Sequence, residues 1–136
     1  MRVRLNTIVR GVTAAVAVAI VLVSLLPIPQ PRLDRFPLAD KIAHGLAYLV
    51  LTFLLFASLL PGPRMRVLLV AIGGSLVLGG AIELVQPLMM RHRELADLAA
   101  NILGTAAGSG IALAMSGFLR RLLLLGNVRG RGAEAP

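Results

Sequence analysis

The chain has no cysteine, no tryptophan and one tyrosine, and only six of its 136 residues are acidic. The absence of cysteine excludes disulfides, thiolate metal sites and cysteine nucleophiles, and it leaves the redox compartment open. Only 15% of the residues are charged, whereas a soluble domain carries about a quarter. A soluble fold of this size would have too few polar side chains to cover its surface. We therefore expect lipid, rather than water, to face most of the chain.

The charge that is present is mainly basic, with a net charge of +8. Almost all of the basic residues are arginines at the edges of apolar runs, and aromatic residues that could stack on bases make up only 4% of the chain. This pattern predicts no nucleic-acid partner. It is typical of a signal that sets membrane topology.

Four apolar runs cover residues 11–26, 42–60, 67–90 and 98–118, and the mean hydropathy is +0.87. A membrane span takes about 20 residues at about 1.5 Å each. With their flanks, the runs predict helices over about 8–27, 41–60, 66–90 and 96–120. Because the connections are short, we expect an all-α fold, an integral membrane antiparallel four-helix bundle over residues 1–125. Residues 126–136 are predicted to be a disordered cytoplasmic tail.

The basic residues also predict an orientation. Arg2, Arg4 and Arg10 precede the first run as in a signal peptide, but the run ends in PIPQPR. That ending has no small-x-small cleavage site, so we interpret the run as a retained signal-anchor helix. The N-terminus, second loop and tail together carry nine Lys and Arg residues, against five in the first and third loops. Both termini are therefore predicted to be cytoplasmic.

Polar residues cluster at the outer ends of the predicted helices. The spacings of three or four residues place each cluster on one helix face. The clusters are Asp40, His44 and Tyr48; Glu83 and Gln86; and Asp97 and Asn101, with Gly104 continuing the last stripe.

These patterns resemble the VanZ-like family of small polytopic bacterial membrane proteins, over roughly residues 40–108. The matching residues are Asp40, Lys41, His44, Tyr48, Glu83, Gln86, Arg91, Asp97, Asn101 and Gly104. The family usually places a Pro-Gly turn before its arginine, whereas this chain has PLMMRHRE, so either Arg91 or Arg93 matches. The resemblance implies a multi-pass protein of the bacterial cytoplasmic (inner) membrane. It also implies an envelope-related role linked to glycopeptide (teicoplanin) resistance, without an established reaction.

Glu83 is the sharpest candidate for a functional residue. A carboxylate at the centre of a membrane helix costs about 2.5–3.5 kcal/mol, so Glu83 should face protein or water. Pro87 cannot donate a hydrogen bond to the Glu83 carbonyl, so the helix is expected to kink or end there. Glu83 could instead pair structurally with Arg91 or His44.

The other candidates also have structural interpretations. His44 could bridge helices or transfer protons, whereas Asp40 and Lys41 favour ion pairing with Arg91 or Asp97. Tyr48 is expected to pack, and Asn101 to join helices by a hydrogen bond.

Glycines also predict helix contacts. Gly104 and Gly108, together with Gly79 and Gly80, are expected to pack the third and fourth helices together, with the seam of a homo-oligomer as the alternative.

The functional prediction is recognition of an envelope component at the outer face. The ligand would be an anionic lipid head group or a lipid-linked cell-wall intermediate, with Arg91, Arg93 and Lys41 meeting the anion. The alternatives are a small intramembrane hydrolase or transferase with His44 or Glu83 as general base, and a proton-coupled carrier. Whether the chain is an enzyme stays open. No phosphate-binding glycine loop or His pair with metal-ligand spacing occurs, so no metal or cofactor is predicted. His44 with Glu83, Asp40 or Asp97 nevertheless has ligand types that suit a hard cation.

Overall fold

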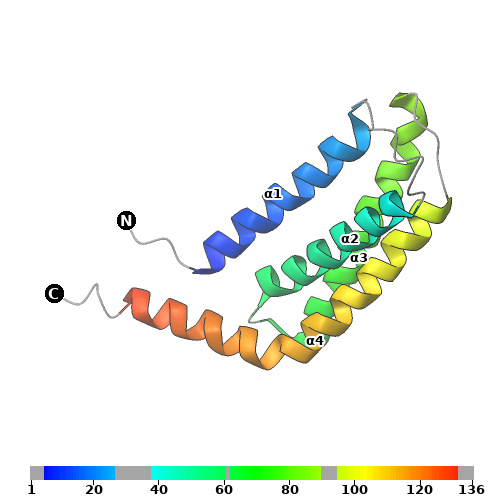
Figure 1. Ribbon diagram of the computed structural model, residues 1–136. Helices are drawn as coiled ribbons and strands as arrows, with labels where there is room; N and C mark the ends of the chain where they lie inside the picture. The colour runs from blue at the N-terminus through cyan, green and yellow to red at the C-terminus, as the bar shows by residue number, and fades with distance from the viewer. Residues whose placement is uncertain (1–4, 27–37, 61, 90–94, 132–136) are drawn as a thin grey trace.

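The computed structural model describes residues 5–26, 38–60, 62–89 and 95–131, and the regular structure within them is helical. The helices are α1 (Leu5–Leu25), α2 (Ala39–Leu59), α3 (Arg64–Val85), a 3₁₀-helix (Gln86–Met89) and α4 (Leu95–Arg131) (Figure 1). Each of the four α-helices is long and apolar enough to cross a membrane. The prediction of an all-α chain with four candidate membrane-spanning helices is therefore confirmed.

Large apolar side chains are exposed along all four α-helices. Prominent examples are Val18 on α1, Ile42 on α2, Val77 on α3 and Leu103 on α4. Soluble monomers rarely expose apolar surface on this scale, because water contact with it is unfavourable. The surface is the kind that a lipid bilayer would cover.

The helix ends follow the prolines, with two differences from the predicted bounds. α3 begins directly after Pro63 and ends at Val85 rather than near residue 90. Pro87 lies in the following 3₁₀-helix, as expected for a residue that cannot continue the α-helical hydrogen bonds. α4 continues to Arg131, well beyond the predicted end near residue 120 and into the segment expected to be disordered. Residues 121–125 are one arginine and four leucines, which are good helix formers and favour the first part of this extension, whereas Gly126 and Gly130 disfavour the rest.

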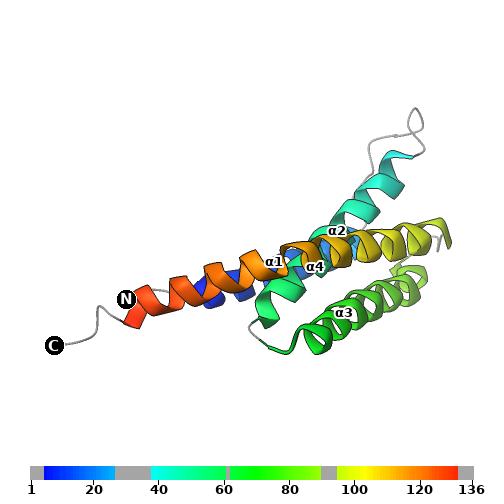
Figure 2. The ribbon, with the colours of Figure 1, turned by 90° about the horizontal axis from the view of Figure 1, so that it is seen from below.

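α2 lies at the centre of the structure and contacts each of the other three helices. It crosses α4 at an angle (Figure 2), and glycines let the two backbones approach closely. A Cβ atom on Gly104 would overlap the Gly45 carbonyl, and one on Gly108 would overlap the Leu49 carbonyl. The expectation that Gly104 and Gly108 pack the third and fourth helices together is therefore wrong, because these glycines face α2.

The contact between α2 and α3 combines a small residue with a buried hydrogen bond. A Cβ atom on Gly79 would lie 3.1 Å from the Tyr48 ring, so Gly79 makes the space that Tyr48 fills. Further along α2, the Thr52 hydroxyl donates to the Tyr48 carbonyl at 2.8 Å, so the Ser75 hydroxyl donates to Thr52 Oγ1, also at 2.8 Å. Thr52 and Ser75 are fully buried. A hydrogen bond of this kind links helices where apolar surroundings offer no competing water.

α1 is held to α2 by polar contacts near one end. Thr13, the buried residue of α1, contacts the Leu54 carbonyl through its hydroxyl at 3.3 Å. One turn earlier, Arg10 Nε donates to the Ser58 carbonyl at 3.2 Å. These contacts fix the first half of α1 against the last half of α2.

The close crossing of α2 and α4 gives the first prediction. Gly104→Ala should lower the free energy of unfolding by about 1–3 kcal/mol, because the added methyl group must displace the Gly45 backbone. Thermal unfolding of the purified protein in detergent measures the effect. Gly110→Ala is the matched control on the same helix, since nothing lies within 4 Å of the position its Cβ atom would take. Equal melting temperatures for the two variants would contradict this account of the crossing.

Candidate functional site

The first turns of α2 and α4 lie at the same end of the structure as the last turns of α1 and α3 (Figure 1). Because Gly45 packs against Gly104, the residues that precede them on the two helices also face each other. Lys41 meets Asp97, and His44 meets Asn101. The crossing therefore assembles a polar cluster, which we define as Asp40, Lys41, His44, Asp97 and Asn101.

The ion pair between Lys41 on α2 and Asp97 on α4 joins the two helices within this polar cluster. The Lys41 ammonium group contacts the Asp97 carboxylate directly, and Lys41 Nζ also lies 3.3 Å from Asp40 Oδ2. The Asp97 side chain is 9% exposed and that of Lys41 is 22%, whereas the Asp40 side chain is 42% exposed. Asp97 is therefore the buried charge of the pair, and Asp40 is the carboxylate that reaches the surface.

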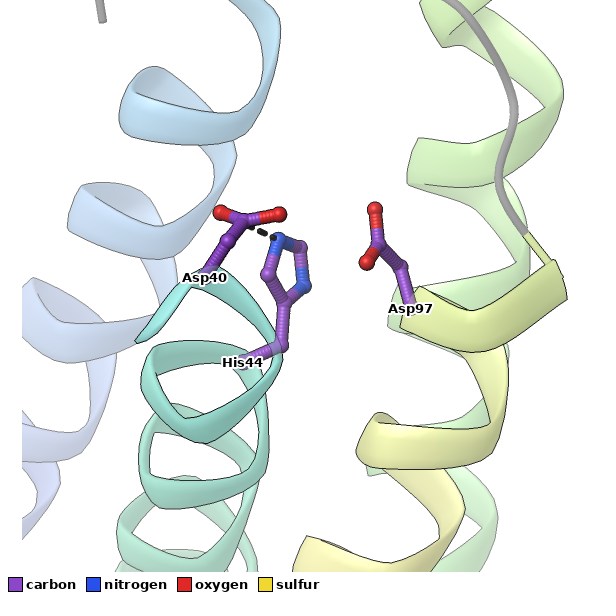
Figure 3. Close-up of side chains that lie close together, drawn as sticks. All are labelled: Asp40, His44 and Asp97. Atoms are coloured by element: carbon purple, nitrogen blue, oxygen red, sulfur yellow. Dashed lines mark ion pairs between the residues drawn. The ribbon is translucent and has the colours of Figure 1, made fainter. Parts of the chain in front are cut away.

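The His44 ring lies between Asp40 and Asp97 (Figure 3). Its Nδ1 atom is 3.3 Å from Asn101 Oδ1. Because an amide oxygen can only accept a hydrogen bond, Nδ1 must be the donor. In the neutral ring, Nε2 then carries the lone pair, and this atom lies 3.9 Å from Asp40 Oδ1. Asn101, which is 3% exposed, thus fixes the tautomer and the orientation of His44.

Three members of the polar cluster offer metal-ligand atoms. Oxygens of Asp40 and Asp97 and a ring nitrogen of His44 all lie within 4.8 Å of one another. However, the Lys41 ammonium group bridges the two carboxylates. The ammonium group occupies the position between the Asp40 and Asp97 carboxylates, so a metal ion bound by both carboxylates would have to displace it. The geometry therefore favours an ion-pair network.

The second group of predicted site residues comes from three elements: Tyr48 lies one turn deeper on α2, Glu83 lies on α3, and Gln86 begins the 3₁₀-helix. Tyr48, Glu83 and Gln86 are all buried, at 2%, 4% and 4% exposure. The Glu83 carboxyl interacts electrostatically with Tyr48, which occupies the position on α2 one turn after His44. The expectation that Glu83 faces the protein interior agrees with this burial. Arg91 and Arg93 lie outside the described residues, so the choice between them stays open.

An apolar groove of about 550 Å³ runs between α1 and α2 and ends at the polar cluster. Its walls include Val16, Ala19 and Ile20 from α1 and Ala47 and Val50 from α2. Asp40 and His44 line the polar end of the groove. Sequence reasoning missed the α1 wall, because these residues carry the same apolar signal as any lipid-facing helix.

Comparisons with family models, curated proteins and solved structures found no match to this chain.

The buried pair gives the second prediction. Lys41→Met should destabilise the protein by about 2 kcal/mol, because it leaves the Asp97 charge buried without this cation. Adding Asp97→Asn should recover much of the loss, since no carboxylate then remains at that position. Melting temperatures of the single and double variants measure the coupling.

Asp40→Asn is the matched control, because its half-exposed carboxylate should contribute less than about 1 kcal/mol. If the double variant is no more stable than Lys41→Met alone, Lys41 does not act by neutralising Asp97.

Proposed function

We propose that the chain is an integral protein of the bacterial cytoplasmic membrane, an antiparallel four-helix bundle with both termini in the cytoplasm. The distribution of Lys and Arg supports this orientation. So do three arginines, Arg10, Arg64 and Arg120, which donate to the backbone carbonyls of Ser58, Leu113 and Gly62. These contacts lie at the end opposite to the polar cluster. Arginines at the cytoplasmic boundary would anchor the bundle there.

In this orientation the polar cluster lies at the outer face, and its function is to recognise the head group of a lipid or of a lipid-linked cell-wall component. The observation that carries the proposal is the groove, because it joins an apolar channel to Asp40 and His44. A ligand with an apolar chain and a polar head group would match the groove along its length, with the chain in the apolar part and the head group at the polar end. Binding sites commonly combine an apolar lining with a few polar groups that fix orientation.

Two buried charges next to groove residues, Asp97 near His44 and Glu83 near Tyr48, support the same proposal. Intramembrane ionisable residues are costly and usually mark functional sites. Glu83 and Gln86 would shape the inner part of the site beside Tyr48. If the ligand carries a phosphate, Arg91 or Arg93 would supply its cationic partner. The resemblance to the VanZ-like family makes glycopeptide susceptibility the cellular property to measure.

The orientation has its own test. A reporter that is active only in the cytoplasm, fused after Pro136, should be active. The same reporter inserted between Gln30 and Pro31 should be inactive. The opposite pattern would place the polar cluster at the inner face and exclude recognition from outside.

The groove gives a direct test of lipid recognition. The purified protein should retain bound lipid in native mass spectrometry, and Ala19→Trp should reduce the retained lipid severalfold, because an indole would fill the groove. Ala81→Trp is the matched control, since Ala81 is an exposed alanine of α3 and does not line the groove.

Both variants should fold normally, which melting temperatures would establish. Equal lipid retention by wild type and Ala19→Trp would exclude the groove as the binding site. Lipid-free wild-type protein would contradict the proposed function.

A further inference from the structure

The length of the groove matches one leaflet of a bilayer. On α2 the groove runs from Ala39 to Val50, which is about 17 Å at about 1.5 Å per residue. The hydrocarbon core of a bilayer is about 30 Å thick, so one leaflet contributes about 15 Å. On α1 the lining residues lie in the second half of the helix, between Val16 and Ser24. The groove therefore suits a chain of a lipid that belongs to the leaflet on this side.

The polar end of the groove presents two hydrogen-bond acceptors to each other. Asn101 takes the hydrogen bond of His44 Nδ1, so Nε2 of the neutral ring is an acceptor. It faces Asp40 Oδ1 at 3.9 Å, which is beyond hydrogen-bonding distance. A group with several N–H donors, placed beside these atoms, would satisfy both acceptors.

The charge of the polar cluster points to a cationic group. Asp40 and Asp97 contribute two negative charges and Lys41 contributes one positive charge. With His44 neutral, these described side chains leave an excess of one negative charge. Asp40 is the more exposed of the two carboxylates, and it is the one that lines the groove. Figure 3 shows it on the side of His44 that faces α1.

We infer that the groove binds a phospholipid whose head group ends in a primary ammonium group, namely phosphatidylethanolamine, with the ammonium between Asp40 and His44. This inference rests on the proposed lipid-binding function and specifies its ligand. The ammonium donates to Asp40 Oδ1 and to His44 Nε2, and its charge balances the polar cluster. Charge-assisted hydrogen bonds of this kind are about twice as strong as neutral ones.

The same contacts predict which lipids bind less well. Phosphatidylcholine has the same charge, but its quaternary nitrogen has no N–H group and satisfies neither acceptor. Phosphatidylglycerol offers hydroxyl donors but brings a net negative charge toward Asp40. Preference for phosphatidylethanolamine over phosphatidylcholine would therefore report hydrogen bonding by the ammonium group. It could not arise from net charge or from burial of the acyl chain, which the two lipids share.

The test uses the full chain, exchanged in detergent with an equimolar mixture of phosphatidylethanolamine, phosphatidylcholine and phosphatidylglycerol that have identical acyl chains. Native mass spectrometry then measures the retained lipids. We expect phosphatidylethanolamine to be enriched about five- to tenfold over each of the others. Asp40→Asn should abolish this enrichment, whereas Asp40→Glu should keep most of it. Ala19→Trp should lower the retention of all three lipids.

The outcomes distinguish this inference from the proposed function. If wild type retains all three lipids equally and Ala19→Trp releases them, lipid binding stands and the ammonium inference is overturned. Enrichment of phosphatidylglycerol, or an enrichment of phosphatidylethanolamine that survives in Asp40→Asn, would also overturn it. If the wild-type protein retains no lipid, both proposals fail.

Discussion

The close approach of the α2 and α4 backbones at Gly45 and Gly104 is the constraint on which the rest of the structure depends. Contact between these glycines fixes which residues of the preceding turns of α2 and α4 face each other. Lys41 then meets Asp97 and His44 meets Asn101. A larger residue at position 104 would overlap the Gly45 backbone, so the helices would have to move apart and these contacts would lengthen. In lipid, where apolar burial drives helix association only weakly, such close packing is also a source of stability.

Burying the polar groups of the polar cluster costs free energy in a chain that is mostly apolar. Asp97 and Asn101 are almost fully buried, and an ion pair removed from water seldom stabilises a protein more than apolar packing would. Burial of the Glu83 carboxyl group, beside Tyr48 on the α3 side of α2, is also energetically unfavourable. Asp40 and His44, which are more exposed than Asp97 and Asn101, line the groove. The buried members thus position the accessible ones, which is an arrangement expected of a binding site.

The sequence predicted the helices because their signal is local, consisting of apolar runs, prolines and edge arginines. It also placed Asp40, His44, Asp97 and Asn101 on helix faces at one end, since helical spacing and alternating direction are enough for that. It assigned Gly104 and Gly108 to the wrong neighbour, because a small-residue pattern does not specify its partner helix. The groove was missed for a related reason. Residues such as Val16 and Ala19 look identical in sequence whether they face bulk lipid or line a groove.

In the proposed lipid site, ligand access and ligand specificity would depend on different contacts. Arg10 and Thr13 contact α2 near one end of α1, and the groove lies between the same helices toward the other end. Under the proposed function, a lipid would enter the groove sideways from its own leaflet, without carrying its head group through the hydrocarbon core. Its chain would contact α1 and α2, while its head group would meet side chains whose geometry is fixed by Gly45, Gly104 and Asn101.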